Sequence, residues 1–142
     1  MIYDTDTLSI AEDCASNALN HLYAALRDLN KAYNWGIADI MGGLLLISLA
    51  KQKKMQSAEN ELASARMYIN RLVKTMGSSK RISGLHISTG KLLKFTDVAI
   101  DNPITDIITQ KKIELIRDNV EQAIQKVEII QQKLREQHFL NL

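Results

Sequence analysis

The chain has 142 residues, which is enough for one domain with a single hydrophobic core. Its 46% hydrophobic and 24% charged residues exclude an intrinsically disordered chain, which needs low hydrophobicity and a high net charge. The net charge of +2 is too small to indicate a nucleic-acid-binding protein. A single cysteine excludes a scaffold held together by intramolecular disulfides.

The first predicted element is a long amphipathic helix over residues 6–33, which Asp6 or Thr7 can cap. Its apolar residues recur at alternating spacings of three and four, which is typical of a helix packed against other helices. This seam consists of Leu8, Ala11, Ala15, Ala18, Leu22, Ala25, Leu29 and Ala32, and Leu19, Leu26 and Tyr33 widen it. Cys14 falls on the same apolar face, which favours a small core residue over a reactive nucleophile.

The second predicted element, Trp35 to Ala50, is apolar nearly all round, which is typical of a buried or membrane-facing helix. We expect a short buried helix, bent or interrupted at Gly42 and Gly43. The longest apolar stretch, residues 40–50, is shorter than the roughly 20 residues that span a bilayer. The first residues lack the basic and apolar regions of a signal peptide, so the expected location is cytoplasmic.

Two further long helices and a loop complete the chain. The heptad rhythm resumes at Met55, and Gly77 is well placed to end that helix. Residues 77–90, rich in Ser and Gly, are predicted to form a loop, and residues 135–142 a frayed tail. The last long helix follows Pro103, which suits a first helical turn. The two seams are Met55, Ala58, Leu62, Ala65, Ile69, Leu72 and Met76, then Ile113, Ile116, Val120, Ala123, Val127, Ile130 and Leu134.

An internal duplication is one interpretation of these seams. A shift of 58 residues superimposes the second seam on the third, Asp39 on Asp97, and residues 52–54 on residues 110–112. The two units would be 35–76 and 91–134, each a short apolar helix leading into a long one. Because any two heptad helices can be aligned, chance similarity stays open beside duplication.

These patterns predict a single all-α domain, a helical bundle with three long antiparallel heptad-patterned helices and two short apolar connecting helices. Coiled-coil-like seams on three helices leave apolar surface that one chain need not cover, so we expect a homodimer.

One segment resembles a known family. Asn34-Trp35-Gly36, Asp39 and Gly42-Gly43, followed by a heptad helix and then Phe95-Thr96-Asp97, resemble a family of uncharacterised bacterial helical proteins. That family pairs a W-G-x-x-D-x-x-G-G segment with a later F-x-D segment, and the resemblance covers roughly residues 34–134. Residues 101–103 read Asp-Asn-Pro where the family pattern implies an Asp-Gly step. The resemblance implies a helical fold and a functional importance of the Trp-Gly-Asp-Gly-Gly stretch. It implies no activity or cofactor.

Two sets of residues are candidates for binding. A partner-docking site is predicted at Trp35, Asp39, Gly42, Gly43, Leu44 and Leu45, although such an apolar run is more often the centre of a bundle. Residues 62–96 contain no acid, and an anion-binding surface is predicted at Lys51, Lys53, Lys54, Arg66, Lys74, Lys80, Arg81, Lys91 and Lys94. The ordinary alternative is a solvated basic face that attracts the acidic first helix.

Catalytic and metal sites find weaker support in the residues. Asp39 and Asp97 could act as paired buried acids, but buried acids usually pair with bases or cap helices. Glu114, Glu121 and Glu128 are seven apart, as in a di-iron bundle, but the histidines of such sites are missing beside them. Their place beside the apolar seam favours carboxylates that tune helix pairing. We therefore expect no catalytic residue, metal or cofactor.

Two functions from different classes follow. The leading hypothesis is a non-enzymatic structural or protein-interaction module, a homodimer with an unidentified protein partner. The alternative is a peripheral binder of an anionic membrane or a phosphate-bearing ligand through the basic residues. Steep weakening of binding by salt would favour the alternative.

Overall fold

The computed structural model describes residues 5–42, 45–77 and 110–140, and the side chains of residues 5–34, 51–76 and 110–140. The described chain consists of three α-helices, α1 (Thr5–Gly42), α2 (Leu45–Gly77) and α4 (Gln110–Leu140). The predicted all-α fold is therefore confirmed. The 38 residues of α1 give it a length of about 57 Å at the usual rise per residue. No described helix is both long enough and apolar enough to cross a bilayer.

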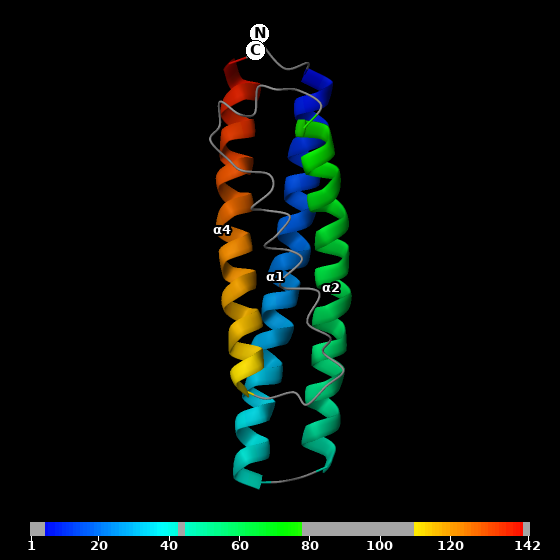
Figure 1. Cartoon of the computed structure of the whole chain (residues 1–142), viewed down its shortest axis with the longest axis vertical. Coiled ribbons are helices and arrows are strands. Elements are labelled where there is room, and N and C mark those ends of the chain that lie inside the picture. The colour runs from blue at the N-terminus through cyan, green and yellow to red at the C-terminus, as the bar shows by residue number, and fades with distance from the viewer. Residues whose placement is uncertain (1–4, 43–44, 78–109, 141–142) are drawn as a thin grey trace.

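The three helices form a narrow rod in which α1 packs against both α2 and α4 (Figure 1). The helix α1 begins at the end of the rod at which α2 and α4 end, so α2 and α4 run back along α1. Both neighbours of α1 are therefore antiparallel to it, as predicted, and parallel to each other. The described part of α4 begins beside Tyr33, where Gln110 Nε2 donates to the Tyr33 carbonyl at 2.8 Å. Residues 34–42 of α1 continue past that point.

The core consists of the three predicted seams. Each seam residue predicted from the three-and-four spacing is buried, and the seams form one continuous cluster along the rod. Leu19 is buried with the first seam, and Leu26 and Tyr33 pack partly buried against it. Alanines supply much of the α1 face, and Ala15, Ala18, Ala25 and Ala32 are fully buried. Small side chains along α1 let the backbones of neighbouring helices approach closely, which keeps the rod narrow.

The separate short helix predicted over residues 35–50 is wrong. Residues 35–42 continue α1, which ends at Gly42, and residues 45–50 belong to α2, which begins at Leu45. One long helix thus ends at Gly42, the first of the two glycines where an interruption was predicted, and the other long helix begins at Leu45. An apolar segment without periodicity carries no information on where one helix ends, so only the glycines marked the boundary.

The internal duplication is likewise not supported. The two seams related by the 58-residue shift, on α2 and α4, both pack against α1. Packing against the same helix explains why the buried residues of the two seams have the same spacing. Residues 78–109 lie outside the described residues. They include all but the first residue of the predicted loop 77–90, and the start of the predicted second unit at residue 91. The helix α2 ends at Gly77, as predicted. The helix α4 continues to Leu140, beyond the predicted start of the tail at residue 135.

Candidate interaction surfaces

Four of the six predicted partner-docking residues lie in the last turns of α1 or at the start of α2. Trp35, Asp39 and Gly42 belong to the last turns of α1, and Leu45 is the first residue of α2. Gly43 and Leu44 lie outside the described residues, as do the side chains of the other four. The helical backbone places this segment at the end of the rod that extends past the first residue of α4 (Figure 1).

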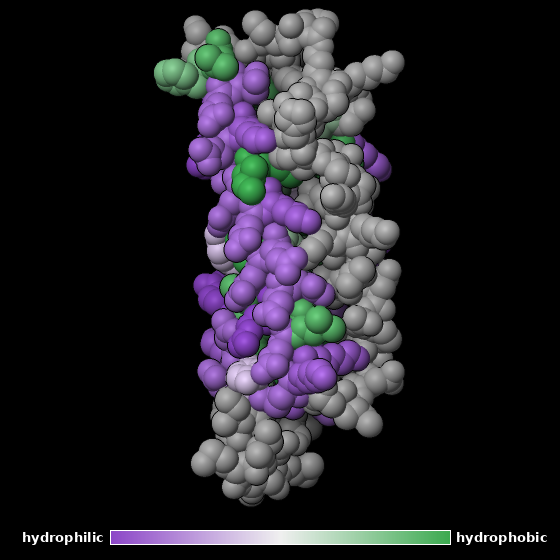
Figure 2. Space-filling view, turned by 60° about the vertical axis from the view of Figure 1, so that its left-hand side comes forward, coloured by the Kyte–Doolittle hydropathy of each residue, from purple (hydrophilic) through white to green (hydrophobic). Residues whose placement is uncertain are grey.

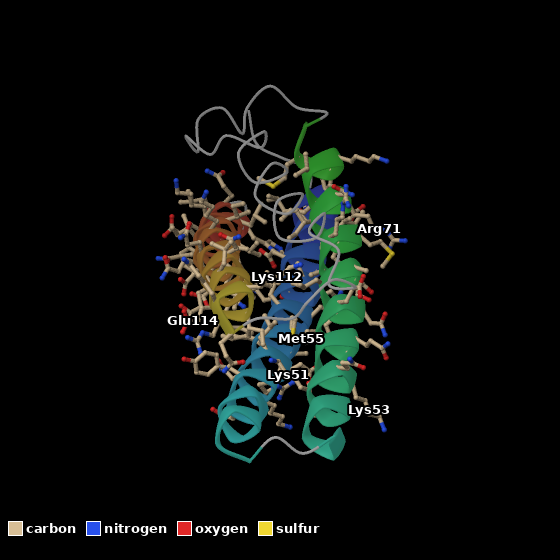
Figure 3. The ribbon with its side chains drawn as sticks, turned by 60° about the horizontal axis from the view of Figure 1, so that its bottom comes forward. Lys51, Lys53, Met55, Arg71, Lys112 and Glu114 are labelled. Atoms are coloured by element: carbon tan, nitrogen blue, oxygen red, sulfur yellow. The ribbon has the colours of Figure 1, made fainter. Side chains whose placement is uncertain are left out.

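The predicted anion-binding residues divide into separate groups. Lys51 and Lys54 are half-buried, while Lys53 is exposed. Figure 3 shows Lys53 on the outer side of α2, whereas Lys51 lies toward α1. Arg66 follows Lys54 by twelve residues, or about 18 Å along the helix. The lysines near the start of α2 therefore do not form one surface with Arg66.

Arg66 and Lys74 lie together on a shallow, open groove on the outer side of α2. The groove is lined by Ala63, Arg66, Met67, Asn70, Arg71 and Lys74. The predicted site did not include Arg71, which is exposed and lines the groove, and whose side chain projects from the outer side of α2 (Figure 3). The helical spacing of residues 63, 67, 70 and 74 places them on one face, and this signal was present in the sequence. The predicted residues Lys80, Arg81, Lys91 and Lys94 lie outside the described residues.

A polar cluster joins α1 to α2 beside the core. His21 Nδ1 lies 2.6 Å from Glu61 Oε2, and the His21 ring stacks on Tyr68 with centroids 5.5 Å apart. Arg71 lies over the ring of Tyr68, with its guanidinium carbon 5.9 Å from the ring centroid. His21 is thus satisfied by a carboxylate and an aromatic ring, which supports a structural role in holding α1 against α2.

A second set of polar contacts joins α1 to α4. Tyr33 Oη donates to Glu114 Oε1 at 2.9 Å, and Tyr23 Oη donates to Glu128 Oε1. Glu121, between the two glutamates, is exposed. These contacts support the interpretation that the carboxylates spaced by seven residues tune helix pairing.

The pKa values of the two tyrosines at this interface are raised. The hydrogen bond to Glu128 raises the pKa of Tyr23, and burial and the negative charge add to the effect. The hydrogen bond to Glu114 likewise raises the pKa of Tyr33. Arg117, whose guanidinium carbon lies 4.8 Å from the Tyr33 ring centroid, lowers the same pKa and opposes part of that rise. Each carboxylate stabilises the neutral, proton-donating form of its tyrosine.

Further contacts of the same kind extend over most of α4. Gln131 Nε2 donates to Ser16 Oγ at 2.8 Å, and His138 Nδ1 lies 3.1 Å from Glu12 Oε1. Because polar partners must match along both helices, this ladder fixes the register of α4 on α1. Among the described side chains, no three His, Cys, Asp or Glu residues gather to hold a metal ion.

Cys14 is buried on the α1 face that packs in the core. Burial raises the pKa of its thiol, and the charge of Asp13 acts in the same direction, while Arg71 opposes them. A protonated, buried thiol is a poor nucleophile, so the environment supports a packing role for Cys14. The side chain of Asp39 and the whole of Asp97, the alternative catalytic residues, lie outside the described residues.

Comparison with known protein families, with curated proteins and with solved structures gives no significant match to this chain.

Proposed function

We propose that this chain is a non-enzymatic protein-interaction module that associates with a second copy of itself through the outer face of α4. The observation that carries the proposal is the exposure of large apolar side chains on that helix. Leu115 is 54% exposed, Ile129 50% and Leu140 73%. Side chains of this kind at the surface of a helix gain free energy when a partner covers them.

The three side chains lie along one stripe of α4. The spacings of 14 and 11 residues correspond to nearly whole numbers of helical turns, so the side chains share one face. Figure 2 shows the outer surface of α4 as largely hydrophilic, with separate apolar spots along its length. A second copy that places the same stripe against this one covers all three positions at once, because a twofold interface uses the same surface twice.

The residues between these apolar positions suit a weak and specific interface. Gln122, Gln125 and Gln132 are exposed on α4, and their amides can each donate and accept hydrogen bonds. Polar residues among apolar ones in a helical interface reduce affinity and fix the register of the two helices. We therefore expect a reversible dimer whose population rises with protein concentration.

Sedimentation velocity over a range of protein concentrations tests the proposal. The double variant Leu115→Lys and Ile129→Lys is expected to lower the association constant at least about tenfold, since each lysine must be desolvated at the interface. The matched control is Ile10→Lys, which changes an apolar side chain with 54% exposure on α1. An unchanged association constant in the double variant, with normal helix content, would contradict an α4 interface.

The alternative function is a peripheral binder of anionic membranes or phosphate-bearing ligands. The basic groove on α2 favours it, because Arg66, Arg71 and Lys74 lie close together there. The separation of this groove from Lys53 weighs against a continuous basic face. Co-sedimentation with phosphatidylserine vesicles at increasing salt tests this function, since binding through exposed charges weakens steeply as salt screens them.

We also propose that the chain is related to the uncharacterised bacterial helical proteins that it resembles, and that it is located in the cytoplasm.

A further inference from the structure

The outer groove of α2 has the shape of a helix-packing surface. Its lining residues form two neighbouring rows with a spacing of about four residues, Ala63-Met67-Arg71 and Arg66-Asn70-Lys74. Rows of this spacing form the ridges between which a ridge of another helix packs. Ala63 has a small side chain, which leaves the groove hollow at one end, and Met67 is 44% exposed. The groove can therefore receive an apolar side chain over Met67.

The charge of the groove selects the chemistry of its occupant. Three of the six lining residues are cationic, and none of the six is acidic. Arg71 and Lys74 are exposed to solvent at the end of the groove farther from Ala63. Arginine pairs with carboxylates through two parallel hydrogen bonds, and lysine through a flexible point charge. Carboxylates about one and two turns to the same side of an apolar side chain would match these positions, because Arg71 follows Met67 by four residues and Lys74 by seven.

We propose that this groove docks an acidic amphipathic helix of a partner protein, an inference that rests on the proposed role as an interaction module. An apolar side chain of the partner covers Met67, and carboxylates about one and two turns away pair with Arg71 and Lys74. This is the helix-in-groove mode of recognition, in which apolar anchors give affinity and charges give specificity.

The composition of the groove favours a protein helix over a lipid surface. Insertion into a bilayer uses an extended apolar face with basic residues at its border. Here the apolar lining consists of Ala63 and Met67, and polar Asn70 lies between Arg66 and Lys74 in the second row. A single anchor surrounded by charged and amide groups fits one helical ridge better than a membrane interface.

The probe is a synthetic alanine-based helical peptide with one leucine and glutamates four and seven residues after it. Its binding to the full chain is measured by fluorescence anisotropy. The variant Arg71→Gln with Lys74→Gln is expected to weaken binding about tenfold, and Met67→Ser is expected to weaken it independently of salt. The matched control is Lys53→Gln, which removes an exposed charge from α2 outside the groove and should leave binding unchanged.

Several outcomes would overturn the proposal. If Lys53→Gln weakens binding as much as the groove variant does, the attraction is nonspecific. If a peptide with glutamines in place of the glutamates binds equally well, the charges of the groove do not select its occupant. Binding of phosphatidylserine vesicles or inorganic phosphate that depends on Arg71 and Lys74, without peptide binding, assigns the groove to those ligands instead. The variant Leu115→Lys with Ile129→Lys separates the two proposals. This variant should lose self-association and keep peptide binding. If the groove does not bind the peptide, the unchanged chain should still self-associate.

Discussion

Tyr33 of α1 and Glu114 of α4 share a hydrogen bond of 2.9 Å between residues that are 81 positions apart in the sequence. The contact lies at the start of the described part of α4, and Arg117 lies over the same tyrosine ring. One tyrosine thus holds the first turns of α4 through a carboxylate and a cation. With Tyr23 and Glu128 farther along, it gives the pairing of α1 and α4 a dependence on the protonation state of two phenols.

The first prediction concerns alkaline pH. The pKa values of Tyr23 and Tyr33 are raised above the ordinary value of 10.0 in the folded chain. Both hydrogen bonds therefore stabilise the fold fully below pH 10 and lose this contribution as pH rises through the raised pKa values. The double variant Tyr23→Phe and Tyr33→Phe should show a flatter decline of unfolding free energy above pH 10 than the unchanged chain. Urea unfolding at a series of pH values measures both, and parallel declines would disprove the coupling.

The second prediction concerns the core. Leu22 is 1% exposed in the seam of α1, so Leu22→Ala removes buried methyl groups and leaves a cavity. We expect it to lower the free energy of unfolding by about 2–5 kcal/mol in denaturant titrations. Ile10→Ala is the control, because Ile10 is exposed on the same helix and its truncation should cost less than about 0.5 kcal/mol. Similar losses from both variants would contradict the assigned orientation of α1.

The third prediction concerns the thiol. Because Cys14 is buried and its pKa is raised, reaction with a disulfide reagent at neutral pH should require opening of the bundle. An opening that costs about 3 kcal/mol slows labelling by about a hundredfold relative to the chain unfolded in urea. Absorbance of the released thiolate follows the reaction. Labelling of the native chain at the unfolded rate would place Cys14 at the surface.

The fourth prediction concerns the contact between α1 and α2. A double-mutant cycle with His21→Gln and Glu61→Gln should give a coupling energy of about 0.5 kcal/mol at pH 6, since both side chains are partly exposed. Tyr68 stacks on His21, so its truncation is kept out of this cycle. The same cycle with Glu59, an exposed neighbour on α2, serves as the control and should give no coupling.

Much of this fold could be predicted from the spacing of apolar residues alone. The seams of α1, α2 and α4 are buried position by position, because a period near 3.5 residues determines which face of a helix avoids water. The boundary between α1 and α2 could not be placed in this way. From Trp35 to Ala50 nearly every residue is apolar, so the sequence contains no contrast between an inner and an outer face.

The interaction surfaces were predicted less completely, because they depend on register between helices. The spacing of Glu114 and Glu128 placed them beside the seam, but their partners Tyr33 and Tyr23 follow only from the alignment of α1 with α4. A count of charges along the chain grouped Lys53 with Lys74, although the helix separates them. Arg71 lies in the same acid-free stretch but was not assigned to the predicted surface, although the helical face brings it beside Lys74.

The polar ladder between α1 and α4 also determines how the rod responds to mechanical load. Thr5 and Leu140 lie at the same end of the bundle, and the two helices run in opposite directions (Figure 1). A force that separates these two residues acts first on the contact between Glu12 and His138, and then on each later contact in turn. The helices are therefore opened like a zipper, which requires a lower peak force than shearing all contacts together. When the chain is pulled at these two residues, α4 separates from α1 and the contacts between them break one after another.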